Sequence, residues 1–249
     1  MLEKVDLSLT LDKDQYEREI LEAQYKLVIL QQQARQAGIP LAIMYEGWDA
    51  GGKGGSILRI TQKLDPRGYR VWPVGAPNEV EREHDYLWRF WTRMPEKGGI
   101  AIFDRSWYGR VLVERVEGLA KPQEWKRAYD EIRHFEETLV DNGTVLIKFW
   151  MHISKDEQLR RFKEREADPF KQWKIGPDDW RNREKWDQYL TAAEEMFEKT
   201  DTKKCPWHIV AAESKHYARV KTATIVVKAL EDAVKSRAGD AQPSQTAGG

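Results

Sequence analysis

Residues 40–60 read PLAIMYEGWDAGGKGGSILRI, and this stretch decides the fold. It contains the pattern G-x-x-x-x-G-K from Gly47 to Lys53. An apolar run precedes the pattern and a helical pattern follows it, which is the context that a phosphate-binding loop (P-loop) requires. Successive backbone N–H groups of such a loop surround an anion at a helix N-terminus, and the lysine adds a positive charge. The predicted phosphate-binding residues of the loop are Lys53, Gly47, Gly51, Gly52, Gly54 and Gly55.

The loop lacks the hydroxyl group that usually binds magnesium. Gly54 follows the lysine, whereas P-loops commonly carry Ser or Thr at this position. Asp49 lies inside the loop, and its carboxylate is the candidate to replace the hydroxyl. The alternative is that Asp49 only accepts hydrogen bonds from nearby backbone N–H groups, as aspartates in turns often do.

Composition limits the classes of function. The chain has 249 residues, enough for one sizeable α/β domain, with 41 basic and 41 acidic residues. A net charge of zero argues against a nucleic-acid partner, because such domains are usually basic. The single cysteine, Cys205, indicates a reducing compartment. Because we find neither a signal peptide nor a membrane-spanning stretch, we predict a cytoplasmic protein without a membrane partner.

Strands alternate with helices along the chain, which favours a parallel sheet with helices on both faces. The predicted strands are 41–45, 69–74, 100–104, 145–151 and 207–212. The predicted helices are 12–35, 53–64, 79–94, 123–141, 155–166 and 215–236. The sequence therefore predicts an α/β protein, a three-layer α/β/α sandwich with a mostly parallel sheet of about five strands. We assign residues 1–237 to a single domain and residues 238–249 to a disordered tail.

The stretch 165–186 has a different composition, with two prolines, three tryptophans and many cations. A long, irregular, charged insertion in a compact domain is often a lid or a binding loop. We therefore predict a lid over residues 165–186, and Arg165, Lys171 and Lys174 are its candidate phosphate-binding cations. The alternative for each of them is a solvated surface charge.

A second motif follows the predicted strand 100–104. Asp104 ends this apolar strand, as the acid of a Walker B motif does, and would emerge beside the P-loop at the carboxyl edge of the sheet. Asp104 and Asp49 are therefore the predicted ligands of Mg²⁺.

Cations surround these two acids in the sequence. Arg105 and Arg110 follow Asp104 closely, and Lys63 and Arg67 lie at and beyond the end of the predicted helix of the P-loop. Phosphoryl transfer needs mainly positioning and charge neutralisation, which such cations supply. The alternative for the two arginines is ion pairing with Glu114 and Glu117. We find no convincing general base, which is acceptable if the acceptor is itself a phosphate.

Five segments together resemble the family-2 polyphosphate kinases, and the resemblance covers about residues 12–230. They are EGWDAGGKGG at 46–55, LDPRG at 64–68, YLWRFW at 86–91, FDRSWYGRVLVER at 103–115 and DPFKQWK at 168–174. The resemblance implies a P-loop kinase fold that transfers phosphate reversibly between inorganic polyphosphate and nucleotides, with Mg²⁺ or Mn²⁺. It also implies a homo-oligomer, a dimer or a tetramer.

The resemblance assigns roles to individual residues. It implies that Lys53 and the loop glycines hold the transferred phosphate, that Asp49 and Asp104 bind magnesium, and that Arg105 and Arg110 contact phosphates. Arg165 would close over the reacting groups. Some members have Asn where this chain has Gly109, and the glycine version is similar to members that accept AMP. The implied nucleotides are therefore ADP, ATP and AMP, with guanine nucleotides also open.

Two other functions remain open from the sequence. One is an ATP-dependent nucleoside monophosphate kinase, whose acceptor is also a phosphate. The other is a non-catalytic P-loop protein that binds a polyanion. Assays with and without polyphosphate distinguish both from a polyphosphate-dependent nucleotide kinase.

Overall fold

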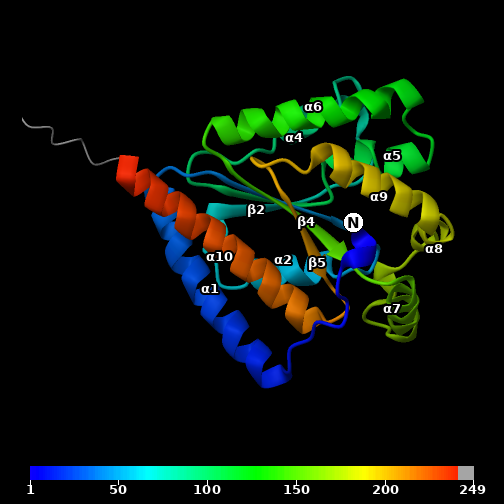
Figure 1. Ribbon diagram of the computed structural model, residues 1–249, viewed down its shortest axis with the longest axis horizontal. Coiled ribbons are helices and arrows are strands. Elements are labelled where there is room, and N and C mark those ends of the chain that lie inside the picture. The colour runs from blue at the N-terminus through cyan, green and yellow to red at the C-terminus, as the bar shows by residue number, and fades with distance from the viewer. Residues whose placement is uncertain (241–249) are drawn as a thin grey trace, which may run out of the picture.

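A five-stranded parallel sheet forms the centre of the molecule (Figure 1). The computed structural model describes residues 1–240. The strands are β1 (Leu41–Gly47), β2 (Tyr69–Pro73), β3 (Ile100–Asp104), β4 (Val145–His152) and β5 (Trp207–Ala211). Their order across the sheet is β2-β3-β1-β4-β5, and every pairing is parallel. The central strand β1 is buried on both faces, as its continuous apolar sequence predicts.

Helices cover both faces of the sheet, which confirms the predicted α/β sandwich. In Figure 1, α1, α2 and α10 lie on one face, and α4, α5, α6 and α9 lie on the other. The α-helices are α1 (Lys13–Gln36), α2 (Lys53–Thr61), α3 (Glu79–Arg82), α4 (Trp88–Trp91), α5 (Val113–Val116), α6 (Pro122–Asp141), α7 (Lys155–Ala167), α8 (Pro177–Glu184), α9 (Trp186–Thr200) and α10 (Lys215–Asp240). Short 3-10 helices are η1 (Leu2–Lys4), η2 (Pro66–Gly68), η3 (Trp107–Arg110) and η4 (Gln172–Lys174). Among residues 1–240, none of the helices combines the length and the apolar character that crossing a membrane requires.

The prediction of one continuous helix over residues 79–94 was wrong. This segment is divided into α3 and α4 by a turn. The backbone N–H of Leu87 donates to the Asp85 carboxylate at 2.9 Å. A side chain that accepts from the backbone two residues later forms a turn in place of a helix.

The predicted lid, 165–186, is not irregular. It contains the end of α7, the 3-10 helix η4 and all of α8. Pro177 occupies the first turn of α8, and the Asp179 carboxylate accepts from the Gly176 N–H at 2.9 Å. Proline at the first helical position is therefore a start signal here, where we had interpreted it as a mark of a loop. Helix α9, which follows, was not predicted.

The last helix begins where the sequence predicts, because the Ser214 hydroxyl accepts from the Tyr217 N–H at 3.2 Å. It continues to Asp240, so residues 238–240 of the predicted tail are helical. Residues 241–249, the rest of that tail, lie outside the described residues.

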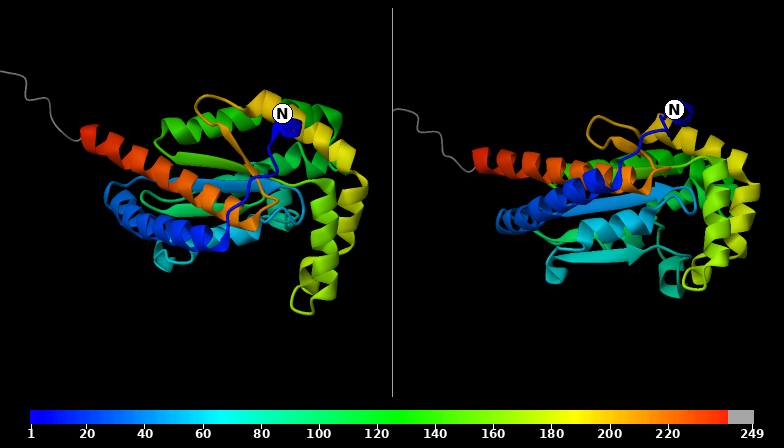
Figure 2. Two further views of the ribbon diagram at one scale, coloured as in Figure 1. Left: turned by 60° about the horizontal axis from the view of Figure 1, so that its bottom comes forward. Right: turned by 90° about the horizontal axis from the view of Figure 1, so that it is seen from below.

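Register brings the two sequence motifs together. Tyr45 of β1 pairs with Asp104 of β3, so the P-loop and the segment after Asp104 leave the sheet at neighbouring strand ends. Helices α7 and α8 extend from the body beside this edge, and both views of Figure 2 show them as a projecting pair. The fold therefore places the P-loop, the segment after Asp104 and the lid around one edge of the sheet.

Candidate active site

The P-loop joins the end of β1 to the start of α2, and its backbone conformation requires glycine at two positions. Gly47 has φ 128°, and a Cβ atom there would lie 2.4 Å from the carbonyl oxygen of Met151. Gly52 precedes α2 with φ 102°. Both backbone conformations are open to glycine and unfavourable for other residues. Gly54, by contrast, has open space around it, so the hydroxyl missing from this loop is not excluded by crowding.

Lys53 lies over the loop. Its Nζ donates to the carbonyl oxygens of Gly47 at 2.9 Å and of Trp48 at 3.1 Å. Burial lowers the pKa of the Lys53 ammonium, and the negative charge of Asp49 partly opposes this. A charged group removed from water interacts more strongly with any phosphate that enters the site.

Two strained residues flank the same edge. Ala50 has φ 60° and Arg105 has φ 68°, and within residues 1–240 these are the non-glycine positions with positive φ. Such conformations cost on the order of 1 kcal/mol or more and tend to occur at functional sites. Arg105 is held in this conformation by its N–H, which donates to the Tyr45 carbonyl at 2.9 Å.

Asp49 is paired rather than free. One carboxylate oxygen accepts from Arg105 Nη2 at 2.9 Å and the other from Asn182 Nδ2 of α8 at 2.8 Å. The alternative reading, that Asp49 only caps its own turn, does not describe this geometry. Asp49 instead connects the P-loop both to the segment after Asp104 and to the lid.

Asp104 contrasts with Asp49. It ends β3 and is partly exposed, and we find no hydrogen bond to its carboxylate from any residue of the described chain. Its negative charge nevertheless favours the charged form of Lys53. Within residues 1–240, there is no cluster of three or more His, Cys, Asp or Glu side chains that could hold a metal ion. A metal here would therefore have only the two aspartates as side-chain ligands of these types.

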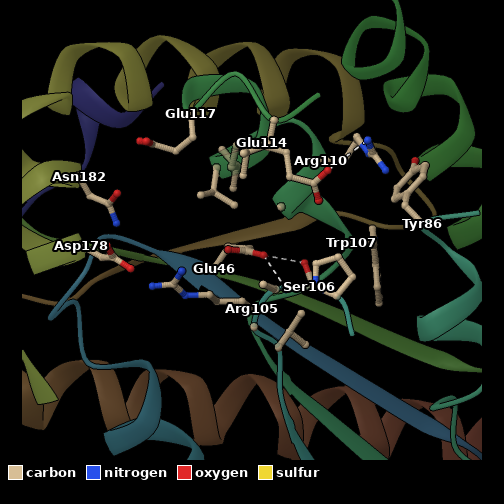
Figure 3. A pocket seen from close by; sticks show the side chains of 18 of the residues that line it. Glu46, Tyr86, Arg105, Ser106, Trp107, Arg110, Glu114, Glu117, Asp178 and Asn182 are labelled. Atoms are coloured by element: carbon tan, nitrogen blue, oxygen red, sulfur yellow. Dashed lines mark hydrogen bonds and ion pairs between the residues drawn. The ribbon is translucent and has the colours of Figure 1, made fainter. Parts of the chain in front are cut away.

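Glu46 fixes the turn after Asp104 and was not among the predicted site residues. Its carboxylate accepts from both the N–H and the hydroxyl of Ser106, each at 2.8 Å (Figure 3). Burial raises the pKa of Glu46, and the Ser106 hydroxyl opposes this rise. The sequence did contain a signal for this role, because Glu46 lies at the end of an otherwise apolar strand. A carboxylate buried there requires hydrogen-bond donors such as the N–H and hydroxyl of Ser106.

A cavity of about 740 Å³ opens beside these groups. Figure 3 shows Arg105 and Asn182 on one side of it and Arg110 on the other. Arg110 pairs with Glu114 at 3.1 Å, as the alternative interpretation states, and lies 4.4 Å from the ring centre of Tyr86. The cavity thus carries guanidinium groups on two sides.

Helix α7, which leads into the predicted lid, is anchored to the P-loop by side chains that the sequence did not identify. The buried Arg161 of α7 donates to the carbonyl oxygens of Ala50 at 2.8 Å, Ala212 at 2.6 Å and Glu213 at 2.9 Å. Gln158 donates to the Asp49 carbonyl at 3.1 Å. These contacts hold the base of the lid in place.

The predicted lid cations lie at different depths. Arg165 is half-buried and donates to the Lys174 carbonyl at 3.0 Å. Burial lowers its pKa, and the charges of Asp179 and Asp49 oppose this. Lys171 forms an ion pair with Asp168, and Lys174 lies 5.0 Å from the Trp173 ring centre. Both lysines are exposed at the far end of the lid, so the structure brings Arg165 nearer to the site than these two.

Two other predicted phosphate-binding residues lie away from the P-loop. Lys63 follows the carboxyl end of α2 and lies 5.1 Å from the Tyr25 ring centre on α1. Arg67 precedes β2 and pairs with Asp65 at 2.8 Å. Because β2 begins opposite the start of β3, Arg67 lies at the amino edge of the sheet, away from the loop. The structure does not bring these residues to the predicted site.

A buried histidine makes the stability of the P-loop depend on pH. His152 Nδ1 accepts a hydrogen bond from Trp48 Nε1 at 3.0 Å, and burial lowers the His152 pKa to about 4, partly opposed by Glu194. The unfolded chain takes up this proton near pH 6.5 and the folded chain only near pH 4. The contribution of neutral His152 to the free energy of unfolding is therefore fully present above pH 6.5. It is lost as pH falls from 6.5 to 4, by about 3 kcal/mol.

We expect His152→Gln, which keeps an acceptor for Trp48, to flatten this dependence. Urea unfolding of both proteins at several pH values between 7 and 4 measures it. Equal slopes of the free energy of unfolding against pH would contradict the assignment to His152.

A family model described as polyphosphate kinase 2 (PPK2) matches residues 10–238. The chain belongs to the polyphosphate kinase 2 family. The match extends from α1 to α10, so it includes the P-loop, Asp104 and the lid.

Two similar proteins are both named as polyphosphate phosphotransferases. A polyphosphate:AMP phosphotransferase of Pseudomonas aeruginosa is 48% identical over 235 residues, which are 94% of this chain and 47% of the relative. A GDP-polyphosphate phosphotransferase of Mycobacterium tuberculosis is 42% identical over 82% of this chain and 70% of the relative. The chain thus spans about half the length of the first of these proteins.

A solved structure confirms the fold. A polyphosphate kinase 2 from Arthrobacter aurescens TC1 superimposes with a TM-score of 0.89 at 34% identity. The alignment covers 99% of this chain and 88% of that protein. The parallel α/β fold of this chain is therefore shared with a solved member of the family.

Proposed function

We propose that this chain is a polyphosphate-dependent nucleotide kinase. It transfers phosphate reversibly between inorganic polyphosphate and nucleoside di- or monophosphates. The observation that carries the proposal is the convergence of the first P-loop residues, Gly47 to Asp49, with Arg105 and Arg110 on one cavity of about 740 Å³. Lys53 and Asp104 lie beside this cavity and are not part of its lining. Family membership and the names of the relatives support the choice of polyphosphate as donor.

The aspartates fit Mg²⁺, and Mn²⁺ can take its place. Magnesium is bound in many phosphotransferases by one or two carboxylates, with phosphates and waters as further ligands. Asp104 offers an oxygen donor that no described residue occupies, and Asp49 would exchange its bonds to Arg105 and Asn182 for the metal. When bound, the metal neutralises phosphate charge.

The residues of the chain position and neutralise the reacting groups. A terminal phosphate oxygen of the nucleotide attacks the terminal phosphorus of polyphosphate in line. A new O–P bond forms, the bridging P–O bond breaks, and the electron pair stays on the shortened polyphosphate. Lys53 and Arg105 stabilise the charge that spreads over the transferred group. No general base is needed, because the attacking oxygen is already ionised at neutral pH.

A direct assay tests the proposal. Protein, Mg²⁺ and long-chain polyphosphate are mixed with ADP or AMP, and the ATP and ADP formed are measured. We expect phosphorylation of both acceptors that requires polyphosphate. Turnover of AMP with ATP alone, without polyphosphate, would instead support a nucleoside monophosphate kinase. Binding of polyanions without any turnover would support a non-catalytic role.

We propose that AMP is accepted as well as ADP, and Gly109 supports this. It lines the cavity, and a Cβ atom there would lie 3.7 Å from Val113 and 4.0 Å from the Glu114 carboxylate. AMP has one phosphate fewer, so its nucleoside must sit deeper for its phosphate to reach the donor. Glycine adds no side chain to this part of the cavity wall, which leaves more room for the deeper position than a larger residue would.

We therefore expect Gly109→Asn to lower kcat/KM for AMP by about tenfold and to change that for ADP much less. The asparagine side chain would fill the inner part of the cavity beside Glu114. Steady-state rates with the two acceptors, measured side by side, give the ratio. Gly109→Ala is the matched control, since its Cβ would make only ordinary contacts. An unchanged ratio in the asparagine variant would contradict this role of Gly109.

The remaining expectations stay predictions. They are a cytoplasmic location, a dimer or tetramer of this chain, and the absence of a nucleic-acid partner. Light scattering of the purified protein measures the second of these directly.

A further inference from the structure

A second cleft, of about 320 Å³, lies at the other edge of the sheet. Its walls come from the end of α1, from the segment that leads into β2, and from the turn before β3. Because β2 and β3 start together, this cleft lies at the amino ends of these strands. It is therefore distinct from the P-loop cavity at their carboxyl ends.

The lining of this cleft is strongly basic. It carries one carboxylate, Glu96, against five cations. The cations are Arg35, Arg67, Arg70, Arg93 and Lys97. We call the set of five cations the basic cleft. The excess of positive charge contrasts with the zero net charge of the whole chain.

Three of these cations form no ion pair within residues 1–240. Hydrogen bonds from Arg67 lower the pKa of the Asp65 carboxylate, and the charge of Arg35 contributes to this lowering. Arg67 is paired with Asp65, and Arg93 is paired with Glu81. For the side chains of Arg35, Arg70 and Lys97, we find no hydrogen bond or ion pair within residues 1–240, and all three are exposed. Unpaired cations that line one concave surface attract an anion that can contact several of them at once.

The backbone under the basic cleft is held firmly. The buried Gln31 of α1 donates to the Asp65 carbonyl at 3.0 Å and accepts from the Asp65 N–H at 2.8 Å. On the other wall, a Cβ atom at Gly98 would lie 2.8 Å from the Arg35 Cα, so the turn before β3 packs directly on α1. The backbone of the three segments is therefore fixed, so binding an anion costs entropy only in the exposed side chains of the cations.

Strand β2 connects the basic cleft to the P-loop cavity. Arg70 and Trp72 of β2 line the basic cleft, and Val74, just after the strand, lines the P-loop cavity. Five residues of strand span about 15 Å, so a linear chain can reach from one cleft to the other. Glu81 marks where the two clefts adjoin. It lines the P-loop cavity and pairs at 2.5 Å with Arg93, which belongs to the basic cleft.

We propose that the basic cleft binds a distant segment of inorganic polyphosphate while the end of the same chain reacts at the P-loop. This inference rests on the proposed function. A linear polyanion fits the observations because its many charges can engage cations at both ends of β2, whereas a single phosphate can engage only one cleft. The LDPRG motif at residues 64–68 then has a place in substrate binding, although its arginine lies away from the P-loop.

The test removes two of the unpaired cations together. We expect Arg35→Ala/Arg70→Ala to raise KM for long-chain polyphosphate about fivefold or more and to leave kcat unchanged. KM for tripolyphosphate, which is too short to reach both clefts, should stay within about twofold. The dependence of the long-chain KM on salt should also become shallower, because fewer phosphates are neutralised.

A matched variant controls for the loss of charge. Lys203→Ala/Lys221→Ala also removes two exposed cations, here lysines, and neither residue lines either cleft. This variant should retain the wild-type KM for both donors. Equal changes for long and short donors in the Arg35/Arg70 variant, or no change for either, would overturn the proposal.

A binding measurement separates this inference from the proposed function. Calorimetry with long-chain polyphosphate and no nucleotide should show weaker binding by the Arg35/Arg70 variant than by the wild type, whether or not turnover occurs. If the wild type phosphorylates no nucleotide, the proposed function fails and this measurement still tests the basic cleft. If the variant loses affinity for tripolyphosphate as strongly as for the long chain, the cleft is a separate small-anion site and the proposal is wrong.

Discussion

Replacing Lys53 with alanine is expected to lower kcat for polyphosphate-dependent phosphorylation by about a thousandfold. The Lys53 ammonium lies over the P-loop, and its burial makes its charge effective against the charge that develops on the transferred phosphate. The stability of the folded state should change little, because the loss of two hydrogen bonds is offset by removal of a partly buried charge. Initial rates and thermal unfolding, measured on the same preparation, check both expectations.

Lys63→Ala is the matched control. Lys63 lies just beyond the other end of α2 and contacts the Tyr25 ring, so its loss should leave kcat within about twofold of the wild type. A loss of activity in this variant comparable to that of Lys53→Ala would contradict the placement of the site at the P-loop.

Replacing Asp104 with asparagine is expected to lower kcat by about a hundredfold and to raise the Mg²⁺ concentration needed for half-maximal rate. The Asp104 carboxylate ends β3 beside the P-loop without a hydrogen-bond partner in the described chain, so it is available to a metal. Asparagine keeps the shape of the side chain and removes its charge. Rates over a series of Mg²⁺ and Mn²⁺ concentrations measure the effect.

Asp187→Asn provides the comparison for this variant. Asp187 is exposed on α9 and lines neither cleft, so the same chemical change there should leave the metal dependence unaltered. If Asp104→Asn lowered the rate without shifting the metal dependence, Asp104 would act on the phosphates by a route other than metal binding.

The central sheet could be predicted from sequence because its signals are local. The apolar run 41–45, the glycines after it and Asp104 at the end of the next buried strand each report their own structure within a few residues. Parallel pairing then placed Asp104 next to the P-loop without any knowledge of side-chain contacts. The secondary structure of residues 165–186 was predicted wrongly for the opposite reason, because Pro177 is compatible with a loop and with a helix start.

Contacts between distant segments could not be predicted in the same way. Asn182 is 133 residues from Asp49, and nothing in its own sequence surroundings indicates that it donates to that carboxylate. The same holds for Arg161, whose three backbone acceptors lie in the P-loop and after β5. Lys63 and Arg67 show the converse case, since they are close in sequence to the P-loop helix and yet lie away from its phosphate end.

The two positive φ angles at Ala50 and Arg105 have a practical consequence for engineering. Glycine would relax the backbone at either position, and stability screens are expected to select such changes. At position 105, the glycine that improves stability would also remove the guanidinium group that faces the cavity. Searches for a more heat-resistant form should therefore leave this edge of the sheet unchanged and concentrate on surface positions such as the exposed face of α1.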